Sequence, residues 1–296
     1  MSARNWVLLL LLSLLWGSSF FFYKVLVAAL PPVTVVLGRV GIAAIALHLW
    51  LLVKGEAMPR SRGLWKRFLL LGLLNNVLPF VLIAWGETRI TSGMASIINA
   101  TTPIFMVVVA HLGTDDEKLT AGKLIGIALG FLGVAVLVGP DAFAGGSLVW
   151  GELAVVAASC IYAFAGVYSR RFSGLPPLVA ATGQISGATL ILVPLSLLVD
   201  RPWNFTMPHL SVWASLLAIA VVNTALAYVV YYKMLATAGI TYISLVTFLI
   251  PIIALFLGAS FLGEGITSQA LAGMAIIALG LAAIDGRIVK HLCSGR

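Results

Sequence analysis

The sequence predicts an all-α integral membrane protein with ten transmembrane helices, arranged as two inverted five-helix repeats. Three observations lead to this fold class. The 296 residues are 61% hydrophobic and only 9% charged, with a mean hydropathy of +1.10, which leaves too little polar surface to cover a water-soluble globule. The apolar residues form continuous runs, which favour helices over the alternating strands of a barrel. Finally, the second half of the chain resembles the first.

Ten apolar runs follow one another with short gaps, so no room is left for a soluble domain. Each run is long enough to cross about 30 Å of hydrocarbon as a helix. We expect helices over residues 5–27, 33–53, 68–87, 91–112, 119–139, 148–169, 178–199, 211–235, 240–261 and 267–287. The first run follows Arg4 as a signal peptide would, but it is longer than a signal h-region and lacks a small-residue cleavage site. We therefore expect it to stay as a helix.

The internal repeat is clearest in two segments, Asn75–Pro103 and Asn223–Pro251. Each opens with an asparagine, has a serine 21 residues later (Ser96 and Ser244) and ends with a proline after 28 residues. Both contain a break between two apolar runs. Each segment is therefore expected to form the same pair of helices.

The likeness extends to both ends of each half. Leu30-Pro31-Pro32 matches Leu175-Pro176-Pro177, and Glu117 matches Glu264 before the fifth and tenth runs. The offsets lie between 145 and 148 residues, so the register drifts little. Both glutamates are expected to cap the helix that they precede.

We expect residues 1–145 and 146–296 to be two copies of one five-helix unit. Because five is odd, the second copy must cross the membrane in the opposite sense. Inverted repeats of this kind are typical of transporters, which place a site near the midplane where the halves meet.

The positions of the cations predict the orientation. With the N-terminus inside, the inner side holds fourteen cations and the outer loops hold two. The inner set is Arg4, Lys54, Arg60, Arg62, Lys66, Arg67, Lys118, Lys123, Arg170, Arg171, Lys233, Arg287, Lys290 and Arg296, and the outer set is Arg89 and Arg201. Both termini are therefore expected to be cytoplasmic.

Several short motifs, in this order and with this duplication, resemble a known family. They are Trp16-Gly17-Ser18-Ser19, the Pro31-Pro32 turn followed by Gly38-Arg39, the prolines Pro103 and Pro251, and the glutamates Glu117 and Glu264. Nearly the whole chain resembles the ten-helix EamA-type members of the drug/metabolite transporter superfamily, above all bacterial inner-membrane amino acid and metabolite exporters.

The resemblance implies export of amino acids, aromatic ones among them, and related small metabolites by alternating access. It implies a multi-pass protein of the cell inner (plasma) membrane with a small-molecule substrate and no cofactor. Small multidrug relatives hold a glutamate in the middle of the first helix, whereas the run 5–27 has no acidic residue, so the resemblance does not carry over proton coupling. The alternatives are a drug or nucleotide-sugar exchanger of the same superfamily and an intramembrane enzyme.

Polar and aromatic side chains at mid-depth are the candidates for substrate binding. An amide in hydrocarbon seeks a partner, so it either joins two helices or faces a solute cavity. A tryptophan away from the interfaces can form a wall that stacks on a solute, or it can pack against another helix. Threonine hydroxyls can also bond back to their own helix. The predicted substrate-binding residues are Trp16, Ser18, Asn76, Asn99, Thr102, Asn223, Tyr228 and Thr247.

Three intramembrane prolines, Pro79, Pro103 and Pro251, are predicted hinges. A proline removes one backbone donor and kinks its helix. A plain bend is the alternative for each one, but the matched positions of Pro103 and Pro251 favour a gating role.

Lys24 and Arg39 are the two cations inside predicted helices, where an ionisable side chain is by default a functional hypothesis. Lys24 lies near a helix end and is expected to extend toward the interface. Arg39 lies deeper. It is expected either to hold a substrate carboxylate or, as the favoured alternative, to pair with Glu87.

Other functional classes find little support. The remaining cations sit in short loops, so nucleic acid is not expected as a partner. The two cysteines, Cys160 and Cys293, and the four histidines show no metal-ligand spacing. No helix core carries paired aspartates or a serine with a histidine, so we expect no enzyme. Glycines spaced by four at Gly122, Gly126 and Gly130 allow close helix packing, and a monomer or weak dimer is expected.

Overall fold

The computed structural model describes residues 3–113, 121–138, 147–172, 174–204, 207–237, 243 and 246–285. All regular structure in these ranges is helical. Seven helices are long and apolar enough to span a membrane, at Asn5–Val27, Pro32–Lys54, Arg62–Glu87, Ser92–Leu112, Leu148–Phe172, Pro177–Val199 and Leu210–Leu235. Three shorter apolar helices lie at Gly122–Leu137, Leu249–Phe261 and Ser268–Ala283. The prediction of an all-helical membrane protein is confirmed, with ten helices by count.

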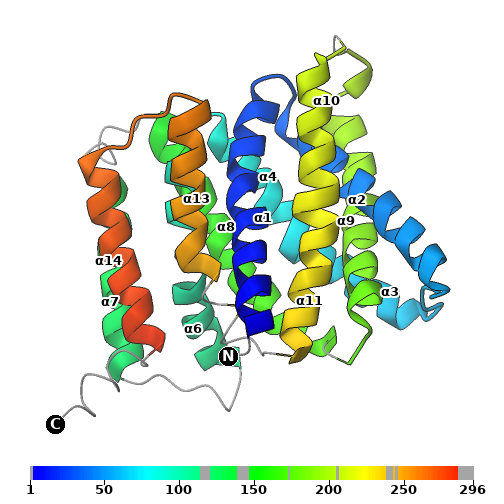
Figure 1. Cartoon of the computed structure of the whole chain (residues 1–296), viewed down its shortest axis with the longest axis horizontal. Coiled ribbons are helices and arrows are strands. Elements are labelled where there is room, and N and C mark those ends of the chain that lie inside the picture. Colours follow the sequence, from blue (N-terminus) through cyan, green and yellow to red (C-terminus); the bar gives the residue numbers. More distant parts are fainter. Residues whose placement is uncertain are drawn as a thin grey trace.

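Figure 1 labels the helical segments in chain order. The first half contains α1 (Ala3–Val27), α2 (Pro32–Lys54), α3 (Arg62–Gly72), η1 (Leu73–Val77), α4 (Leu78–Glu87), α5 (Ser92–Asn99), α6 (Thr102–Gly113) and α7 (Ala121–Val138). The second contains α8 (Ser147–Ser169), η3 (Arg170–Phe172), α9 (Pro177–Val199), η4 (Pro202–Asn204), α10 (Leu210–Leu217), η5 (Ala218–Leu226), α11 (Ala227–Thr237), α13 (Val246–Phe261) and α14 (Ser268–Asp285). The helices α3, η1 and α4 form one continuous rod, as do α10, η5 and α11.

The third helix begins at Arg62, six residues before the predicted start at residue 68. The Ser61 side chain caps it by accepting from the Leu64 amide at 3.4 Å. The Trp65 indole donates to the Pro59 carbonyl at 2.9 Å and fixes the entry of the chain. The predicted start lies too far along the chain because the first turns of α3 are basic and the continuous apolar run begins only after them.

Both repeated asparagines lie in π-helical segments. Asn75 lies in η1 and Asn223 in η5, at corresponding places of the two halves. A π-helical turn changes the direction in which later side chains point, and such turns are frequent at functional sites. The sequence repeat is therefore also a repeat of an unusual backbone.

The two proline-bearing helices differ. The first is broken, because α5 ends at Asn99 and α6 begins at Thr102, directly before Pro103. The second, α13, continues through Pro251. The proline alone does not break the helix, so the break before Pro103 is a local feature of the first half.

The helices pack in pairs that match between the halves. The contact of α1 with α13 has a counterpart in α8 with α6, and the contact of α2 with η5 has one in α9 with η1. In Figure 1, α7 and α14 lie side by side at one edge of the molecule, while α2, α3 and α9 lie at the other. The α3 and α9 backbones come so close that a Cβ atom on Gly72 would lie 2.6 Å from the Ala188 nitrogen. Only glycine fits there.

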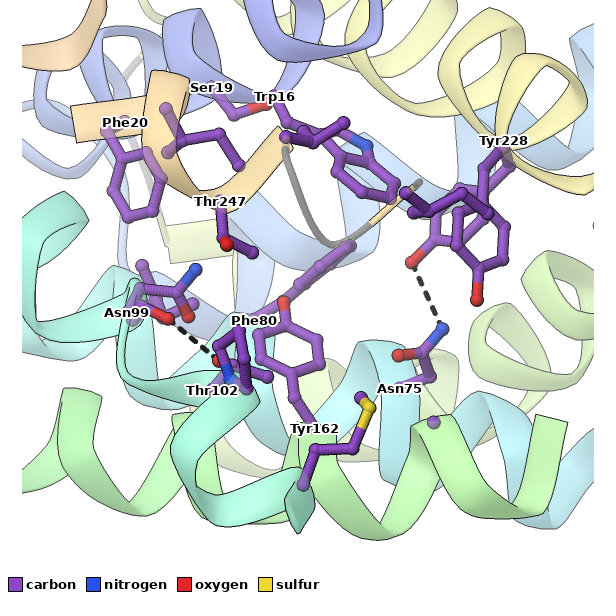
Figure 2. Close-up of a pocket in the computed structure, with 18 of the residues that line it drawn as sticks. Trp16, Ser19, Phe20, Asn75, Phe80, Asn99, Thr102, Tyr162, Tyr228 and Thr247 are labelled. Carbon is purple, nitrogen blue, oxygen red and sulfur yellow. Dashed lines mark hydrogen bonds between the residues drawn. The ribbon is translucent and has the colours of Figure 1, made fainter. Parts of the chain in front are cut away.

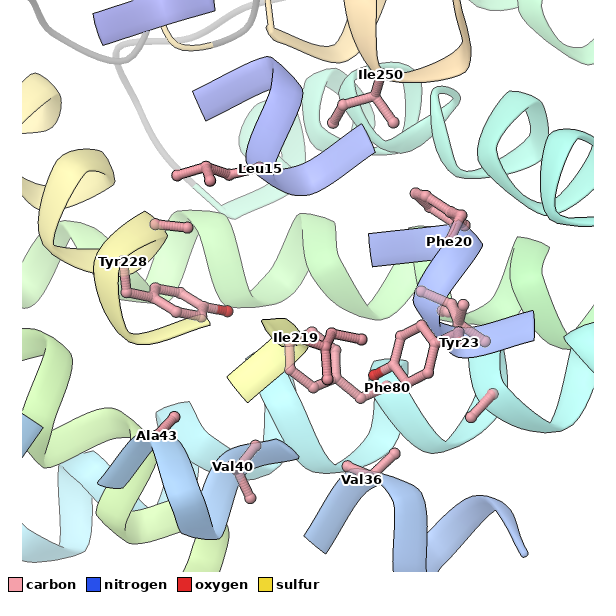
Figure 3. Close-up of a cluster of buried hydrophobic side chains, with 14 of the residues drawn as sticks. Leu15, Phe20, Tyr23, Val36, Val40, Ala43, Phe80, Ile219, Tyr228 and Ile250 are labelled. Carbon is pink, nitrogen blue, oxygen red and sulfur yellow. The ribbon is translucent and has the colours of Figure 1, made fainter. Parts of the chain in front are cut away.

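The apolar core runs through the bundle, and Figure 3 shows the part of it that lies between α1, α2, α4, η5, α11 and α13. Its members include Leu15, Val36, Val40, Phe80, Ile219 and Ile250. Many other large apolar side chains, such as Val53, Leu198 and Phe256, are exposed on the outside of the bundle. An outer surface of this kind fits hydrocarbon and would be costly in water.

Candidate functional site

A cavity lies among the helices of both halves. Its volume, measured as the space open to the centres of water molecules, is about 200 Å³. One water needs about 10–15 Å³ by this measure, so the cavity has room for a small metabolite. Seven aromatic side chains dominate its wall, at Trp16, Phe20, Tyr23, Phe80, Tyr162, Tyr228 and Tyr231. The polar lining residues are Ser19, Arg39, Asn75, Asn99, Thr102 and Thr247. Figure 2 shows how most of these side chains surround the space.

The predicted site residues divide into two groups. The cavity is lined by Trp16, Asn99, Thr102, Tyr228, Thr247, Pro103 and Arg39. The residues that do not line it are Ser18, Asn76, Asn223, Pro79, Pro251 and Lys24.

The aromatic wall is built around Trp16. Its ring lies 5.6 Å from the Tyr231 ring and 6.2 Å from the Tyr228 ring, the latter edge to face. Tyr228 and Tyr231 are themselves 6.3 Å apart in an edge-to-face arrangement. Rings that contact one another in this way are stiff, so they present a preformed apolar surface for an aromatic or aliphatic solute.

Asn76 belongs to a series of hydrogen bonds beside the cavity that links Tyr228, Asn76, Gln184 and Tyr232. The Asn76 Nδ2 atom donates to the Tyr228 hydroxyl at 2.9 Å, and Gln184 Nε2 donates to Asn76 Oδ1 at 2.7 Å. The Tyr232 hydroxyl donates to Gln184 Oε1 at 2.6 Å. The neighbouring residue Asn75 faces the cavity instead, with its Nδ2 atom 3.4 Å from the same Tyr228 hydroxyl. Asn75, which is not among the predicted substrate-binding residues, is thus the lining amide of η1.

Asn223 and Ser18 join η5 to α1. The Asn223 Nδ2 atom donates to the Leu15 carbonyl at 2.6 Å and to Ser18 Oγ at 2.8 Å. Ser18 in turn donates to the Leu14 carbonyl at 2.7 Å. Both side chains are therefore placed as helix-joining groups, and Ser19 is the serine of α1 that lines the cavity.

Arg39 is 3% exposed and lines the cavity from α2. Its Nε atom donates to Thr224 Oγ1 at 2.8 Å, and its Cζ atom lies 3.8 Å from the centre of the Phe80 ring. The favoured partner, Glu87, makes no hydrogen bond to Arg39, because both carboxyl oxygens of Glu87 are buried without a hydrogen-bond partner in the described part of the chain. The bond to Thr224 and the Phe80 ring hold the guanidinium on the cavity wall.

Lys24 ties α1 to the C-terminal end of α4. Its Nζ atom donates to the Glu87 and Ile90 carbonyls, each at 2.7 Å. A cation at this place offsets the partial negative charge of a helix C-terminus. Lys24 therefore binds backbone oxygens rather than extending freely toward the interface.

Glu264 caps a different helix from the predicted one. Its carboxylate accepts from the Ser92 amide at 2.9 Å and from the Ser92 hydroxyl at 2.7 Å, at the start of α5. The helix that follows it, α14, is instead capped by Thr267, whose hydroxyl oxygen accepts from the Ala270 amide at 3.0 Å. The loop before α14 reaches across to α5, a tertiary contact that no local pattern reveals. Other residues named in the sequence analysis lie outside the described residues, namely Glu117, Lys118, Ser244, Arg287, Lys290, Cys293 and Arg296.

The chemistry of the lining suits binding. Its described residues include no aspartate, glutamate, histidine or cysteine. Over the described ranges, no group of three or more such side chains is placed to hold a metal ion. The wall offers stacking surfaces, amides, hydroxyls and one guanidinium, which together can hold a small polar or amphipathic molecule.

The bundle and its cavity define a multi-pass membrane protein with a small-molecule pocket between its helices. The chain belongs to the EamA-like transporter family, whose model matches residues 4–139 and again residues 149–284. Membership of this family implies a small-molecule substrate and embedding in a membrane.

Several relatives share most of the length of this chain. The uncharacterized transporter YoaV of Bacillus subtilis is 26% identical over 87% of this chain and 88% of its own length. A probable terminal-alkyne amino-acid exporter of Streptantibioticus cattleyicolor is 28% identical, with coverage of 85% and 83%. A solved crystal structure superimposes with a TM-score of 0.71 over 99% of both chains, at 18% sequence identity. That likeness shows a shared fold.

Proposed function

We propose that this protein exports amino acids, aromatic ones among them, and related small metabolites across the cell inner membrane by alternating access. The observation that carries the proposal is the cavity, whose aromatic rings, amides, hydroxyls and single guanidinium lie inside the apolar bundle of a transporter-family member. An amphipathic solute would place its apolar part against the rings and its polar groups on the amides and hydroxyls. The printed name of one relative, a probable amino-acid exporter, supports this substrate class.

The two halves, residues 1–145 and 146–296, are proposed to be inverted copies. The two matches of the family model support a duplication. The matched packing of α1 with α13 and of α8 with α6 supports a pseudo-two-fold axis that relates the two halves. In Figure 1, α3 lies at the lower end of the molecule and its counterpart α10 at the upper end. The cation bias of fourteen to two supports cytoplasmic termini.

Closure at one end of the cavity is proposed to alternate with closure at the other. At the end where α1 and α4 finish, Lys24 fastens α1 to α4 and Glu264 fastens the loop before α14 to α5. In the proposed orientation this is the outer end. Pro103 lies beside the break between α5 and α6 and on the cavity wall, which suits a hinge. Opening outward would require the Lys24 and Glu264 contacts to separate.

Transport by the purified protein in liposomes tests the proposal directly. Vesicles preloaded with unlabelled phenylalanine should take up labelled phenylalanine in a saturable manner, and the label should remain chemically unchanged. Protein-free vesicles are the control. Uptake no faster than this control, for phenylalanine and a panel of other amino acids, contradicts the proposal. A chemically altered label would instead favour the intramembrane enzyme, and uptake of nucleotide sugars alone would favour the exchanger alternative.

A further inference from the structure

We propose that Arg39 binds the carboxylate of the substrate, so that the cavity selects small molecules with one carboxylate and an apolar or aromatic body. This inference rests on the proposed function and narrows its substrate class. It is carried by the placement, burial and partners of the Arg39 guanidinium.

The first step concerns the cost of the charge. Arg39 lies within the membrane-spanning part of α2 and is 3% exposed. A charged side chain at such a depth is expensive unless an opposite charge or polar groups compensate for it. Glu87 does not serve as the hydrogen-bonded counter-ion, because its two oxygens lack a partner in the described ranges. The described lining of the cavity contains no acid. The described lining therefore carries one positive charge, that of Arg39, which an anion in the cavity would offset.

The second step concerns the geometry of the donors. A guanidinium has five N–H donors in a flat fork. Thr224 accepts from Nε at 2.8 Å, which leaves the two terminal nitrogens for a second partner. The Phe80 ring, 3.8 Å from Cζ, and the Tyr23 ring, 4.9 Å from Cζ, hold the plane of the fork. A fork fixed in this way matches the two oxygens of a carboxylate.

The third step concerns what surrounds the fork. Phe80 and Tyr23, which hold the guanidinium, line the same cavity as Trp16 and Tyr228. A carboxylate on Arg39 would therefore place the attached carbon skeleton among aromatic rings, where apolar groups are favoured. Charge and shape together select carboxylates with an apolar body over amines with the same body.

Binding to the wild-type protein tests the inference without any variant. Phenylalanine and 3-phenylpropionate carry the carboxylate, whereas phenylalaninamide and phenethylamine carry the same ring without it. Isothermal titration of the purified transporter should give affinities about tenfold or more higher for the two carboxylates, since a charge-assisted bidentate bond is lost in the other two. Equal affinities across the series, or binding of neither carboxylate, would overturn the inference.

Variants of Arg39 then test whether this residue causes the preference for carboxylates. Arg39→Gln should bind the carboxylates and their neutral or cationic analogues with similar affinity, and Arg39→Lys should keep a reduced preference because an ammonium offers charge without the fork. The matched control is Arg89→Gln. The Arg89 Cζ atom also lies over an aromatic ring, 3.7 Å from the centre of Trp85, but Arg89 does not line the cavity. Arg89→Gln should keep the full preference.

A preference retained by Arg39→Gln would contradict the role of Arg39. If that variant does not fold, the wild-type ligand series alone decides. Failure of the proposed function has a different signature, namely binding of carboxylates with no phenylalanine flux in liposomes.

Discussion

Arg39 and Gln184 occupy matching places in the two halves, 145 residues apart, and have different surroundings. Each makes the same kind of connection. Arg39 on α2 donates to Thr224 on η5, and Gln184 on α9 donates to Asn76 on η1. Thr224 and Asn76 are themselves 148 residues apart, so one inter-half hydrogen bond is built twice. The duplicated bonds join each second helix to the π-helical segment of the opposite half.

The two side chains differ in how many of their hydrogen-bonding groups are used between the helices. Gln184 is completely buried, and both ends of its amide are hydrogen bonded, to Asn76 and to Tyr232. Arg39 makes one such bond and presents the rest of its guanidinium to the cavity. The comparison teaches that symmetric contacts join the halves, whereas the proposed carboxylate site lies where one copy departs from the symmetry.

The largest effect should come from placing an arginine at position 184, where the glutamine is fully buried and hydrogen bonded at both ends of its amide. Gln184→Arg would bury a cation without a counter-ion and break the bonds to Asn76 and Tyr232, so it should lower the free energy of unfolding by about 3–5 kcal/mol. Thermal unfolding in detergent measures this. Arg39→Gln is the control and should destabilise far less, because glutamine is what the second copy carries at this place. Equal losses in the two variants would break the comparison.

The aromatic wall should give the next largest effect, on ligand binding rather than on folding. Trp16→Ala removes the ring that contacts Tyr228 and Tyr231, and the affinity for phenylalanine should fall about tenfold. Trp213→Ala, at an exposed position of α10, is the control and should leave the affinity unchanged. Titration of both variants with phenylalanine makes the measurement. A loss shared by both would show that the wall is not specific.

The repeated asparagines sharpen the comparison further. Asn223→Ala removes the bonds to Leu15 and Ser18 and should cost about 0.6–1.7 kcal/mol of stability for each inter-helix hydrogen bond that is lost in the membrane. Asn75→Ala should instead weaken flux with little change in stability, because Asn75 faces the cavity. Unfolding temperature and liposome uptake are measured for both. The reverse pattern would contradict the assigned places.

The smallest effect should come from the prolines. Pro103→Ala restores a backbone donor beside the break between α5 and α6, so it should slow turnover a fewfold while the apparent affinity changes less. Pro251→Ala, within the continuous α13, should slow turnover less than Pro103→Ala does. Initial rates of uptake over a range of phenylalanine concentrations separate the two parameters. Identical rates for Pro103→Ala and the wild type would remove the hinge.

Much of the fold could be predicted because a membrane helix must be a long apolar run. Most described helix ends fall within a few residues of the predicted ends. The exceptions have local causes, such as the basic first turns of α3 and the break after Asn99. The basic turns of α3 lie before its apolar run, and the break after Asn99 lies within an apolar run, so hydrophobicity alone reveals neither.

The site was harder to predict because one residue of helix phase decides which side chain faces the cavity. Asn75 and Ser19 line it, whereas their neighbours Asn76 and Ser18 bond to other helices. The π-helical η1 shifts this phase. The partners of Arg39 come from η5 and α4, which no spacing along α2 indicates.

The insertion of the two copies in opposite senses is the claim on which this account depends. Single cysteines at Ala29 and Gly174, both exposed in the loops before α2 and α9, test it in a background with Cys160 and Cys293 replaced by alanine. In intact cells, a membrane-impermeant thiol reagent should label Ala29→Cys from outside, and Gly174→Cys only after the cells are opened. Labelling of both positions from the same side would contradict the account.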